Sequence, residues 1–356
     1  MRPSKNDPLL DYLRKHSPAS GPQLCRHLGI SRQALSLRLR PLIASGAVVK
    51  VGATRGARYY IREQAPPGQE ISRSLDLRGV DEGQTYDEIA LRLNLKSALR
   101  PNVERIVHYA FTEMLNNAIE HSRADRARIR FRLDAGAVSF EIRDEGIGVF
   151  HSIAEKFDLE NEHAAMVELI KGRTTTLPEA HTGEGIFFTS RVADRFVLRS
   201  HKIELVWDQV RGDTFVSERR YLRGTDVRFM IRRDARRRIE AVFSEFAPAD
   251  YDYRFEKTRV LVRLVRREYV SRSEARRLTA NLEKFREIVL DFKGVESVGQ
   301  GFADEVFRVF AKRHPGTTFR VVNASPAVAA MLAHAGAGDV PGGTPGAHRR
   351  RPSESV

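Results

Sequence analysis

The stretch "FTEMLNNAIEHS", residues 111–122, decides how this chain is interpreted. Glu113, Asn117 and His121 follow one another at intervals of four residues, which places them on one face of a helix. The remaining face is apolar and is expected to pack in a core; it carries Phe111, Met114, Leu115, Ala118 and Ile119. The polar row therefore faces either solvent or a site, and the rest of the sequence must distinguish the two.

Composition limits the class of protein. The 356 residues include 41% apolar and 30% charged residues, which is typical of two or three soluble globular domains. No segment approaches the roughly 18 apolar residues of a membrane span, and the amino terminus lacks the apolar core of a signal peptide, so a cytoplasmic protein without a membrane partner is expected. The single cysteine, Cys25, excludes an internal disulfide and a metal site built from cysteines.

The positive charge is concentrated at the amino terminus. The chain has a formal net charge of +14. Residues 1–64 contain twelve Lys and Arg against three Asp and Glu, a net charge of +9. This distribution favours a polyanionic partner at that end of the chain.

Residues 1–64 are expected to form one small domain. Helical patterns in "DPLLDYLRKHS", "SGPQLCRHLGI" and "SRQALSLRLRPLIASG" precede the hairpin pattern of "AVVKVGATRGARYYI". This order resembles a winged helix-turn-helix domain, in which the third helix enters the major groove of double-stranded DNA. The resemblance implies contacts to DNA from the third helix and the wing: Arg32, Gln33, Ser36, Arg40, Lys50, Arg55 and Arg58. Such domains also bind proteins, and that alternative stays open.

The remaining residues divide into four segments. Residues 65–100 are expected to form a linker and a leading helix, because "REQAPPGQE" is a Pro/Gly break. Residues 101–246 alternate helices with strands, and the tight hairpin in "ARIRFRLDAGAVSFEIRD" predicts an α/β sandwich with an antiparallel or mixed sheet. Residues 257–336 predict a small α/β unit, and residues 337–356 a disordered tail. The fold class expected is therefore multidomain α+β.

Two glycine loops follow the opening helix. Asp144 ends a predicted strand and is followed by Gly146 and Gly148, which permit positive φ angles and close approach of the backbone to a ligand. Gly183 and Gly185 precede a predicted helix, whose free N–H groups would bind an anion. Each loop alone is also compatible with ordinary turns.

Together, the E-x-x-x-N helix, the D-x-G-x-G loop, the second glycine loop and a late "GTDV" strand resemble the Bergerat-fold ATP-binding superfamily over residues 101–235. The resemblance implies that Asn117 binds Mg²⁺ and that Glu113 orients or deprotonates the attacking group. It implies recognition of adenine by Asp144 beside Thr225. The glycines would accommodate the nucleotide: Gly146, Gly148, Gly183 and Gly185.

The insert between the loops, about residues 150–182, corresponds to the lid over ATP in this superfamily. Its "KGRTTT" segment carries Lys171, which we interpret from charge alone as a phosphate ligand, with a solvated loop as the alternative. His121 is expected to be a core or hydrogen-bonded histidine rather than a catalytic one.

The carboxy-terminal unit resembles the STAS fold of anti-sigma-factor antagonists. In "VLDFKGVESVGQGFADEVF", Asp291, Phe292, Gly294 and Val295 match the pattern. The two serines of the pattern, one of which a partner kinase phosphorylates, are replaced by Gln300 and Gly301. A STAS-like module without the phospho-acceptor is therefore expected, serving as a regulatory or dimerisation partner of the ATP-binding domain.

The leading hypothesis is an ATP-binding transcriptional regulator whose DNA binding or oligomeric state responds to nucleotide. The short form of the Asn117 helix most resembles the anti-sigma-factor kinases, so a serine/threonine protein kinase acting on a separate STAS partner is the alternative. A third hypothesis is a stress or defence ATPase whose winged helix docks a protein. Whether ATP is hydrolysed, transferred or only bound stays open at this stage.

Overall fold

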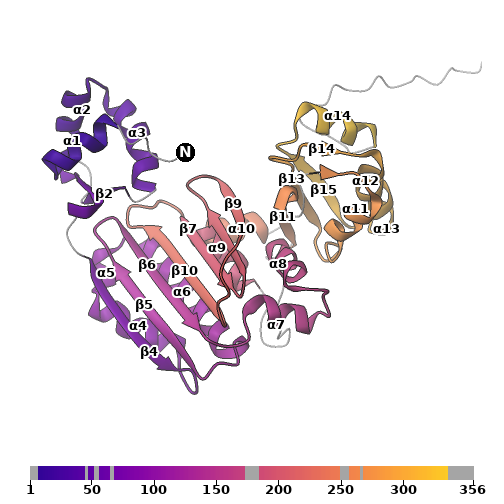
Figure 1. Cartoon of the computed structure of the whole chain (residues 1–356), viewed down its shortest axis with the longest axis horizontal. Coiled ribbons are helices and arrows are strands. Elements are labelled where there is room, and N and C mark those ends of the chain that lie inside the picture. The colour runs from indigo at the N-terminus through magenta and orange to yellow at the C-terminus, as the bar shows by residue number, and fades with distance from the viewer. Residues whose placement is uncertain are drawn as a thin grey trace, which may run out of the picture. The chain divides into compact units, whose positions relative to one another are not determined.

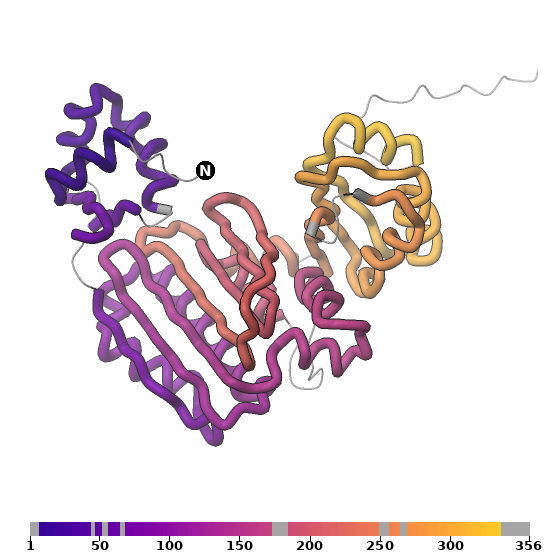
Figure 2. Tube along the Cα trace, in the orientation of Figure 1, coloured from indigo at the N-terminus to yellow at the C-terminus, as the bar shows by residue number. Residues whose placement is uncertain are grey.

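The computed structural model describes residues 7–44, 47–51, 56–64, 68–172, 184–248, 256–264 and 268–335 (Figures 1 and 2). The chain forms two compact units. The first comprises Met1–Glu162 and Thr175–Val242, and the second comprises His163–Thr174 and Phe243–Val356. The expected tail, Arg55 and Gly183 lie outside the described residues.

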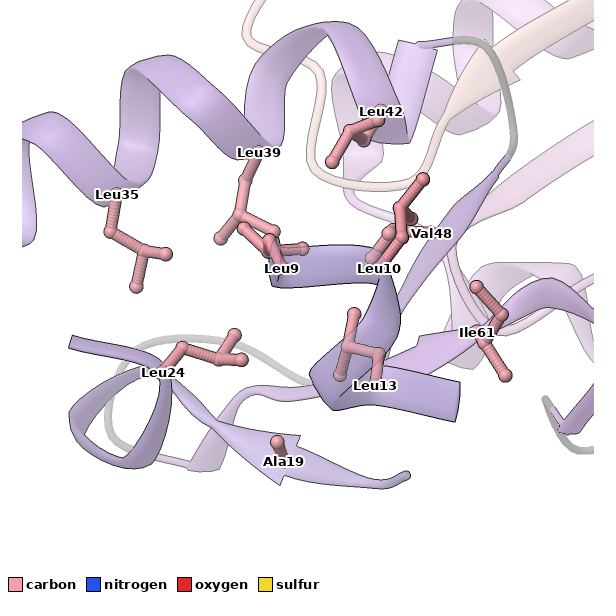
Figure 3. Close-up of a cluster of buried hydrophobic side chains, with 10 residues drawn as sticks. All are labelled: Leu9, Leu10, Leu13, Ala19, Leu24, Leu35, Leu39, Leu42, Val48 and Ile61. Carbon is pink, nitrogen blue, oxygen red and sulfur yellow. The ribbon is translucent and has the colours of Figure 1, made fainter. Parts of the chain in front are cut away.

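The first unit begins with a helical cluster and a small sheet. Its elements are α1 (Pro8–His16), β1 (Ala19–Ser20), α2 (Gly21–Leu28), α3 (Arg32–Ala44), β2 (Val48–Val51) and β3 (Arg58–Ile61). The strands form an antiparallel sheet in the order β1-β3-β2. Ser20 and Gln23 form a capping box at α2. Leucines from all three helices pack with Val48 and Ile61 of the sheet (Figure 3). The three expected helices and the hairpin are present, with β1 in addition.

A seven-stranded antiparallel sheet forms the centre of the first unit, in the order β4-β5-β6-β10-β7-β8-β9. Its strands are β4 (Gln69–Asp76), β5 (Arg126–Leu133), β6 (Ala137–Asp144), β7 (Arg195–Ser200), β8 (Ile203–Asp208), β9 (Asp213–Glu218) and β10 (Thr225–Arg232). The antiparallel interpretation of the sheet is confirmed.

The edge strand β4 corrects one expectation. It lies within residues 65–100, which were expected to form a linker and a leading helix. Arg73 interrupts the apolar alternation between Ile71 and Leu75, and the Pro/Gly break directly before the strand is typical of a linker. The pairing with β5 continues from Gln69–Leu133 to Asp76–Arg126.

Helices cover one face of the central sheet (Figure 1). They include α4 (Glu82–Arg92), α5 (Leu95–Ala98), α6 (Pro101–His121), α7 (Val149–Lys156) and α9 (Gly185–Val192). Phe111 of α6 contacts Phe131 and Phe140 of the sheet, with ring centroids 5.7 and 5.4 Å away. The apolar side of α6 is therefore buried against the sheet, as its periodicity predicts. α10 (Ile239–Phe246) follows the last strand.

The second unit is a small α/β structure. Its three parallel strands, β11 (Lys257–Leu261), β13 (Glu287–Asp291) and β15 (Thr318–Val322), are ordered β11-β13-β15. A second parallel pair joins β12 (Glu268–Tyr269) to β14 (Ser297–Val298). The helices are α11 (Arg272–Thr279), α12 (Gln300–Asp304), a π-helical turn over Glu305–Phe310, α13 (Ala311–Arg313) and α14 (Pro326–His334).

The helix α8 (Glu162–Lys171) is built into this second unit. The ammonium group of Lys171 is fully buried and donates hydrogen bonds to Glu168 Oε1 at 2.7 Å and to the carbonyl oxygen of Ala280 at 2.8 Å. Thr258 donates a hydrogen bond of 2.5 Å to the carbonyl oxygen of Lys171. The segment expected to be one lid is thus divided, because α7 belongs to the first unit and nearly all of α8 to the second.

Among the helices that the structure describes, none combines the length and the apolar character that a membrane crossing requires.

Candidate functional site

A pocket that opens to solvent lies in the first unit between α6 and the sheet, with a cavity volume of about 60 Å³. Its wall is largely apolar, with Met114 of α6, Ile142 of β6 and Ile153 of α7 among the lining residues. Polar side chains reach it from several elements: Asn117, His121, Ser122, Asp144, Ser152 and Thr225. An apolar cavity with a few polar groups of fixed orientation is suited to a small organic ligand.

Asp144 is the buried acid of this pocket. It ends β6 and is only 4% exposed. Its Oδ1 accepts hydrogen bonds from the backbone N–H groups of Gly146 at 2.9 Å and Thr225 at 3.2 Å. Burial raises the pKa of this carboxyl group, and the two N–H groups partly oppose that effect. Within the described residues Oδ2 has no hydrogen-bond partner and remains for a ligand.

The glycines around Asp144 allow the backbone to approach closely. A Cβ at Gly146 would overlap the carbonyl oxygen of Ser122, and Ile147 N–H donates to that same oxygen at 2.9 Å. Gly148 has φ +84°, and a Cβ there would lie 2.5 Å from Ser200 Oγ. Thr225 Oγ1 accepts a hydrogen bond from Val149 N–H at 3.0 Å, which joins β10 to the start of α7. The loop from residue 144 to residue 149 is therefore held from both sides.

Glu113 and Asn117 lie one turn apart on α6. A Cβ at Gly185 would overlap Glu113 Oε2, so the start of α9 lies directly against this carboxylate. Burial, together with Glu113 and Glu184, raises the pKa of Tyr109. Asn117 lines the pocket, and its Nδ2 is buried without a hydrogen-bond partner in the described part of the chain.

The structure places Lys171 in the second unit and corrects its assignment as a phosphate ligand. Its ammonium group is buried in the second unit, where Glu168 and backbone carbonyl groups occupy its hydrogen-bonding capacity. Burial lowers its pKa, although Glu168 opposes the effect. Lys171 therefore stabilises α8 and is not retained as a phosphate ligand. His121 lies at the wall of the pocket, half-buried, with Nε2 3.9 Å from Glu120.

The family comparisons agree with this geometry. Residues 86–207 match the family model for a histidine kinase-like ATPase domain. The first unit therefore contains an ATPase-like domain of this kind, as predicted, and the match includes Glu113, Asn117 and Asp144 but ends before Thr225. Residues 274–329 match a STAS-like domain of unknown function, which confirms the expected fold of the second unit. No curated protein matches the chain.

In the STAS-like domain, Asp291 ends β13 and is 2% exposed. Its carboxylate accepts hydrogen bonds from Arg259 at 2.6 Å and from Asn323 at 2.9 Å. Gln300 and Gly301, which replace the serines of the pattern, open α12. The aspartate of the STAS pattern is therefore structural here, because its two oxygens hold neighbouring strands.

The amino-terminal candidates lie on two elements. Arg32, Gln33, Ser36 and Arg40 are all exposed along α3. Arg58 is exposed on β3, whereas Lys50 on β2 is half-buried and lies 3.5 Å from Asp234 Oδ2. The exposed set on α3 remains available to a partner, and Lys50 is partly engaged within the protein.

Sequence reasoning missed a cluster beside the Gly148 loop. His201 Nδ1 lies 2.5 Å from Glu162 Oε1, and its ring stacks on Tyr221 with centroids 5.0 Å apart. A Cβ at Gly148 would also lie 2.9 Å from His201 Nε2. His201 occupies a tight turn between β7 and β8 with φ +49°, and no local sequence signal connects that turn to residues 148 and 162.

Proposed function

We propose that the pocket binds ATP and that the protein is a nucleotide-responsive regulator that binds double-stranded DNA through its amino-terminal domain. The observation that carries the nucleotide proposal is the buried Asp144, whose Oδ1 is fixed by two N–H groups at the wall of an apolar pocket. A fixed carboxylate oxygen in such a wall suits the exocyclic amino group of adenine.

The other end of the site fits a hydrated cation and phosphates. Within the described residues, no group of three or more His, Cys, Asp or Glu side chains could hold a metal ion. Mg²⁺ usually retains water and ligand phosphates and needs only one or two protein oxygens. Asn117 suits this role, because its amide has an unsatisfied buried end and rotation of the amide can present Oδ1 to a cation. The cation would neutralise phosphate charge next to Glu113.

The nucleotide proposal is tested by binding of ATP to the full chain in the presence and absence of Mg²⁺. Asn117→Ala should remove the Mg²⁺-dependent part of the affinity. Asn116→Ala is the matched control, because Asn116 is the adjacent amide and is not among the residues that line the pocket. Equal affinities for the wild type and Asn117→Ala would exclude the metal assignment. Asp144→Asn should reduce the preference for ATP over GTP, because an amide can donate as well as accept.

The DNA proposal rests on the element order of the amino-terminal domain and on the exposure of Arg32, Gln33, Ser36 and Arg40 along α3. This order is typical of a winged helix-turn-helix domain, in which the third helix, here α3, would enter the major groove. The double variant Arg32→Ala/Arg40→Ala should weaken binding to duplex DNA and lower its salt dependence. Arg14→Ala is the control, since Arg14 is an exposed arginine on a different helix, α1. Absence of any salt-sensitive DNA binding would favour a protein-docking role for this domain.

The link between nucleotide and the rest of the protein is proposed to run through α8. The segment that follows the Gly148 loop begins in the ATPase-like unit and continues as a helix of the STAS-like unit. We propose that a ligand that changes the conformation of the first part of this segment also changes the second unit, because the segment belongs to both. ATP can shift an equilibrium between two conformations of the protein only if it binds them with different affinities. Unchanged DNA affinity and oligomeric state on addition of ATP would exclude a nucleotide-responsive regulator.

Phosphoryl transfer to a separate STAS partner is the second candidate, and the position of Glu113 against the start of α9 supports it. A carboxylate there can accept the proton of an attacking hydroxyl group. The chain's own STAS-like domain has Gln300 and Gly301 where the acceptor serines are expected, so the acceptor must come from another protein. Transfer of labelled phosphate to such a partner, lost in Glu113→Ala, would establish this activity.

A further inference from the structure

Within the described residues of the first unit, helices cover only one face of the central sheet, and arginine side chains dominate part of the other face. Along β5, Ala127, Ile129 and Phe131 are buried toward the helices, so the alternate positions lie on the opposite, open face. Figure 1 shows the strands on one side of this layer and α4, α5 and α6 on the other. We define the arginine face as Arg126, Arg128, Arg130, Arg132, Arg143 and Arg228.

Two of these residues form a like-charged pair. Arg128 of β5 and Arg143 of β6 are direct partners in the register of the sheet. Directly opposed side chains have Cβ atoms about 5 Å apart, and like charges in that position destabilise the pairing. Neither guanidinium group makes a hydrogen bond or ion pair with the part of the chain that the structure describes, and Arg143 Nε is buried without a partner. Arg143 also lies opposite the buried Asp226 of β10 in the register of the sheet, but that carboxylate forms its ion pair with Arg228, so Arg128 and Arg143 keep their like charges side by side.

Three other arginines of the face have acidic partners and keep exposed side chains: Arg132 pairs with Asp134, Arg228 with the buried Asp226, and Arg130 with two glutamates. Arg130 lies 3.5 Å from both Glu70 and Glu141, and its side chain is 51% exposed. Exposed ion pairs such as those of Arg130 contribute little to stability, so exchange of the carboxylate for another anion costs little. Ser74 is the register partner of Arg128 on β4 and supplies a hydroxyl group beside the like-charged pair. The face thus combines cationic and hydroxyl donors.

The spacing of the row favours a regular polyanion. Alternate residues of a strand are about 6.8 Å apart, so Arg126, Arg128, Arg130 and Arg132 form a row roughly 20 Å long. One strand of duplex DNA presents a phosphate about every 3.4 Å along its axis. A regular row of guanidinium groups matches such a repeating charge better than the irregular charges of an acidic protein. Arginine also binds phosphate through two parallel N–H groups.

We propose that the arginine face binds the phosphate backbone of double-stranded DNA, as a second DNA surface in addition to the amino-terminal domain. This surface carries no direct readout of sequence, because it contacts phosphates rather than base edges. Arg143 and Asp144 are consecutive residues of β6 that point to opposite faces, so the DNA surface lies one residue from the carboxylate at the pocket.

The test is binding of a fluorescent 30-bp duplex of random sequence to the full chain over a range of salt concentrations. Arg128→Gln/Arg143→Gln should weaken binding roughly three- to tenfold and reduce the salt slope by about 1 for each phosphate that is no longer neutralised. The variant should unfold at the same or a higher temperature than the wild type, because it removes a like-charged pair. Arg92→Gln, an exposed arginine on α4, is the control and should leave both quantities unchanged.

The same substitutions in the Arg32→Ala/Arg40→Ala background separate this inference from the proposed function. A further loss of affinity there supports a second surface. If Arg128→Gln/Arg143→Gln leaves affinity and salt slope unchanged while Arg32→Ala/Arg40→Ala reduces them, the arginine face is not a DNA surface and the proposed function stands. If the wild type binds no duplex at any salt concentration, the arginine face is not a DNA surface and the proposed DNA binding by the amino-terminal domain is also wrong. If the variant loses binding only because it unfolds at lower temperature, the like-charge argument is wrong and the proposal fails.

Discussion

Glu168 and Lys171 form an ion pair of 2.7 Å on α8, and both side chains are buried in the second unit. Asn281 donates a further hydrogen bond of 3.1 Å to Glu168 Oε2. Removing one partner of a buried ion pair strongly lowers the stability of the fold, because the other charge is then left uncompensated. The hydrogen bonds from Lys171 to the carbonyl oxygens of Arg277 and Ala280, and from Asn281 to Glu168, fix α8 within the second unit. They lead to the first prediction.

Lys171→Met should destabilise the second unit by about 3–5 kcal/mol, because Glu168 would remain buried without its cation. Urea unfolding of the full chain measures this. Lys156→Met, at an exposed lysine on α7, should change stability by less than about 0.5 kcal/mol. ATP affinity should be unchanged below the unfolding transition. A fall in ATP affinity without loss of stability would restore the phosphate assignment of Lys171.

Asp144→Asn should alter the pH dependence of stability. Burial raises the folded-state pKa of Asp144 above the unfolded value of about 3.9. At pH values between the two pKa values, the folded state therefore binds more protons than the unfolded state. The wild type loses stability over this window. The variant lacks the titration, yet its Oδ1 can still accept from Gly146 and Thr225. Its stability relative to the wild type should therefore increase as the pH rises from about 4 through the raised pKa of Asp144, as measured by thermal unfolding. A constant difference would contradict the burial effect.

Gly224→Ala should damage the pocket specifically. Gly224 has φ +77°, and a Cβ there would lie 2.7 Å from Asp144 Oδ1. Gly79→Ala is a matched control, because Gly79 has φ +72° and nothing within 4 Å of the added atom. Both variants carry the backbone strain of about 1–2 kcal/mol, but only Gly224→Ala should lose nucleotide affinity. Equal effects on nucleotide binding would show that the proximity of residue 224 to Asp144 is irrelevant.

Gly185→Ala and Glu113→Ala should be coupled. The added methyl group at Gly185 would displace the Glu113 carboxylate, so Gly185→Ala should destabilise the wild type more than it destabilises the Glu113→Ala variant. Contacting residues usually give interaction energies of about 0.5–3 kcal/mol in such a cycle. Denaturant unfolding of the four proteins measures the interaction energy. If the two changes in the free energy of unfolding are strictly additive, α9 moves away from α6 without a cost in stability.

The parts of the fold that the sequence predicts well are those with local signals. The helix 101–121 has a clear apolar side, and the hairpin that ends at Asp144 alternates strictly, so both could be placed before the structure was known. The pocket residues on them come together because both elements pack through Phe111, Phe131 and Phe140.

The errors occurred where long-range contacts decide the structure. Lys171 looks like a solvated or ligand-binding lysine in its own segment, and only contacts with Arg277 and Ala280, more than a hundred residues later, bury it. Likewise, β4 becomes a strand because β5 pairs with it across about 50 residues. The role of Arg143 in a like-charged pair depends on register, which no local pattern reveals.

The placement of α8 has a practical consequence for dividing this protein into fragments. A cut near residue 250 looks natural from the order of motifs, but it leaves α8 with the amino-terminal fragment and its partners with the other. The first fragment would then present Ala165, Met166 and Leu169 to water, residues that are buried in the intact chain. The second fragment would lose the helix against which Thr258 and Asn281 bond. Neither fragment would be a complete folding unit. The two units therefore cannot be separated by a single cut of the polypeptide, even though the ATPase-like and STAS-like motifs follow one another in the sequence.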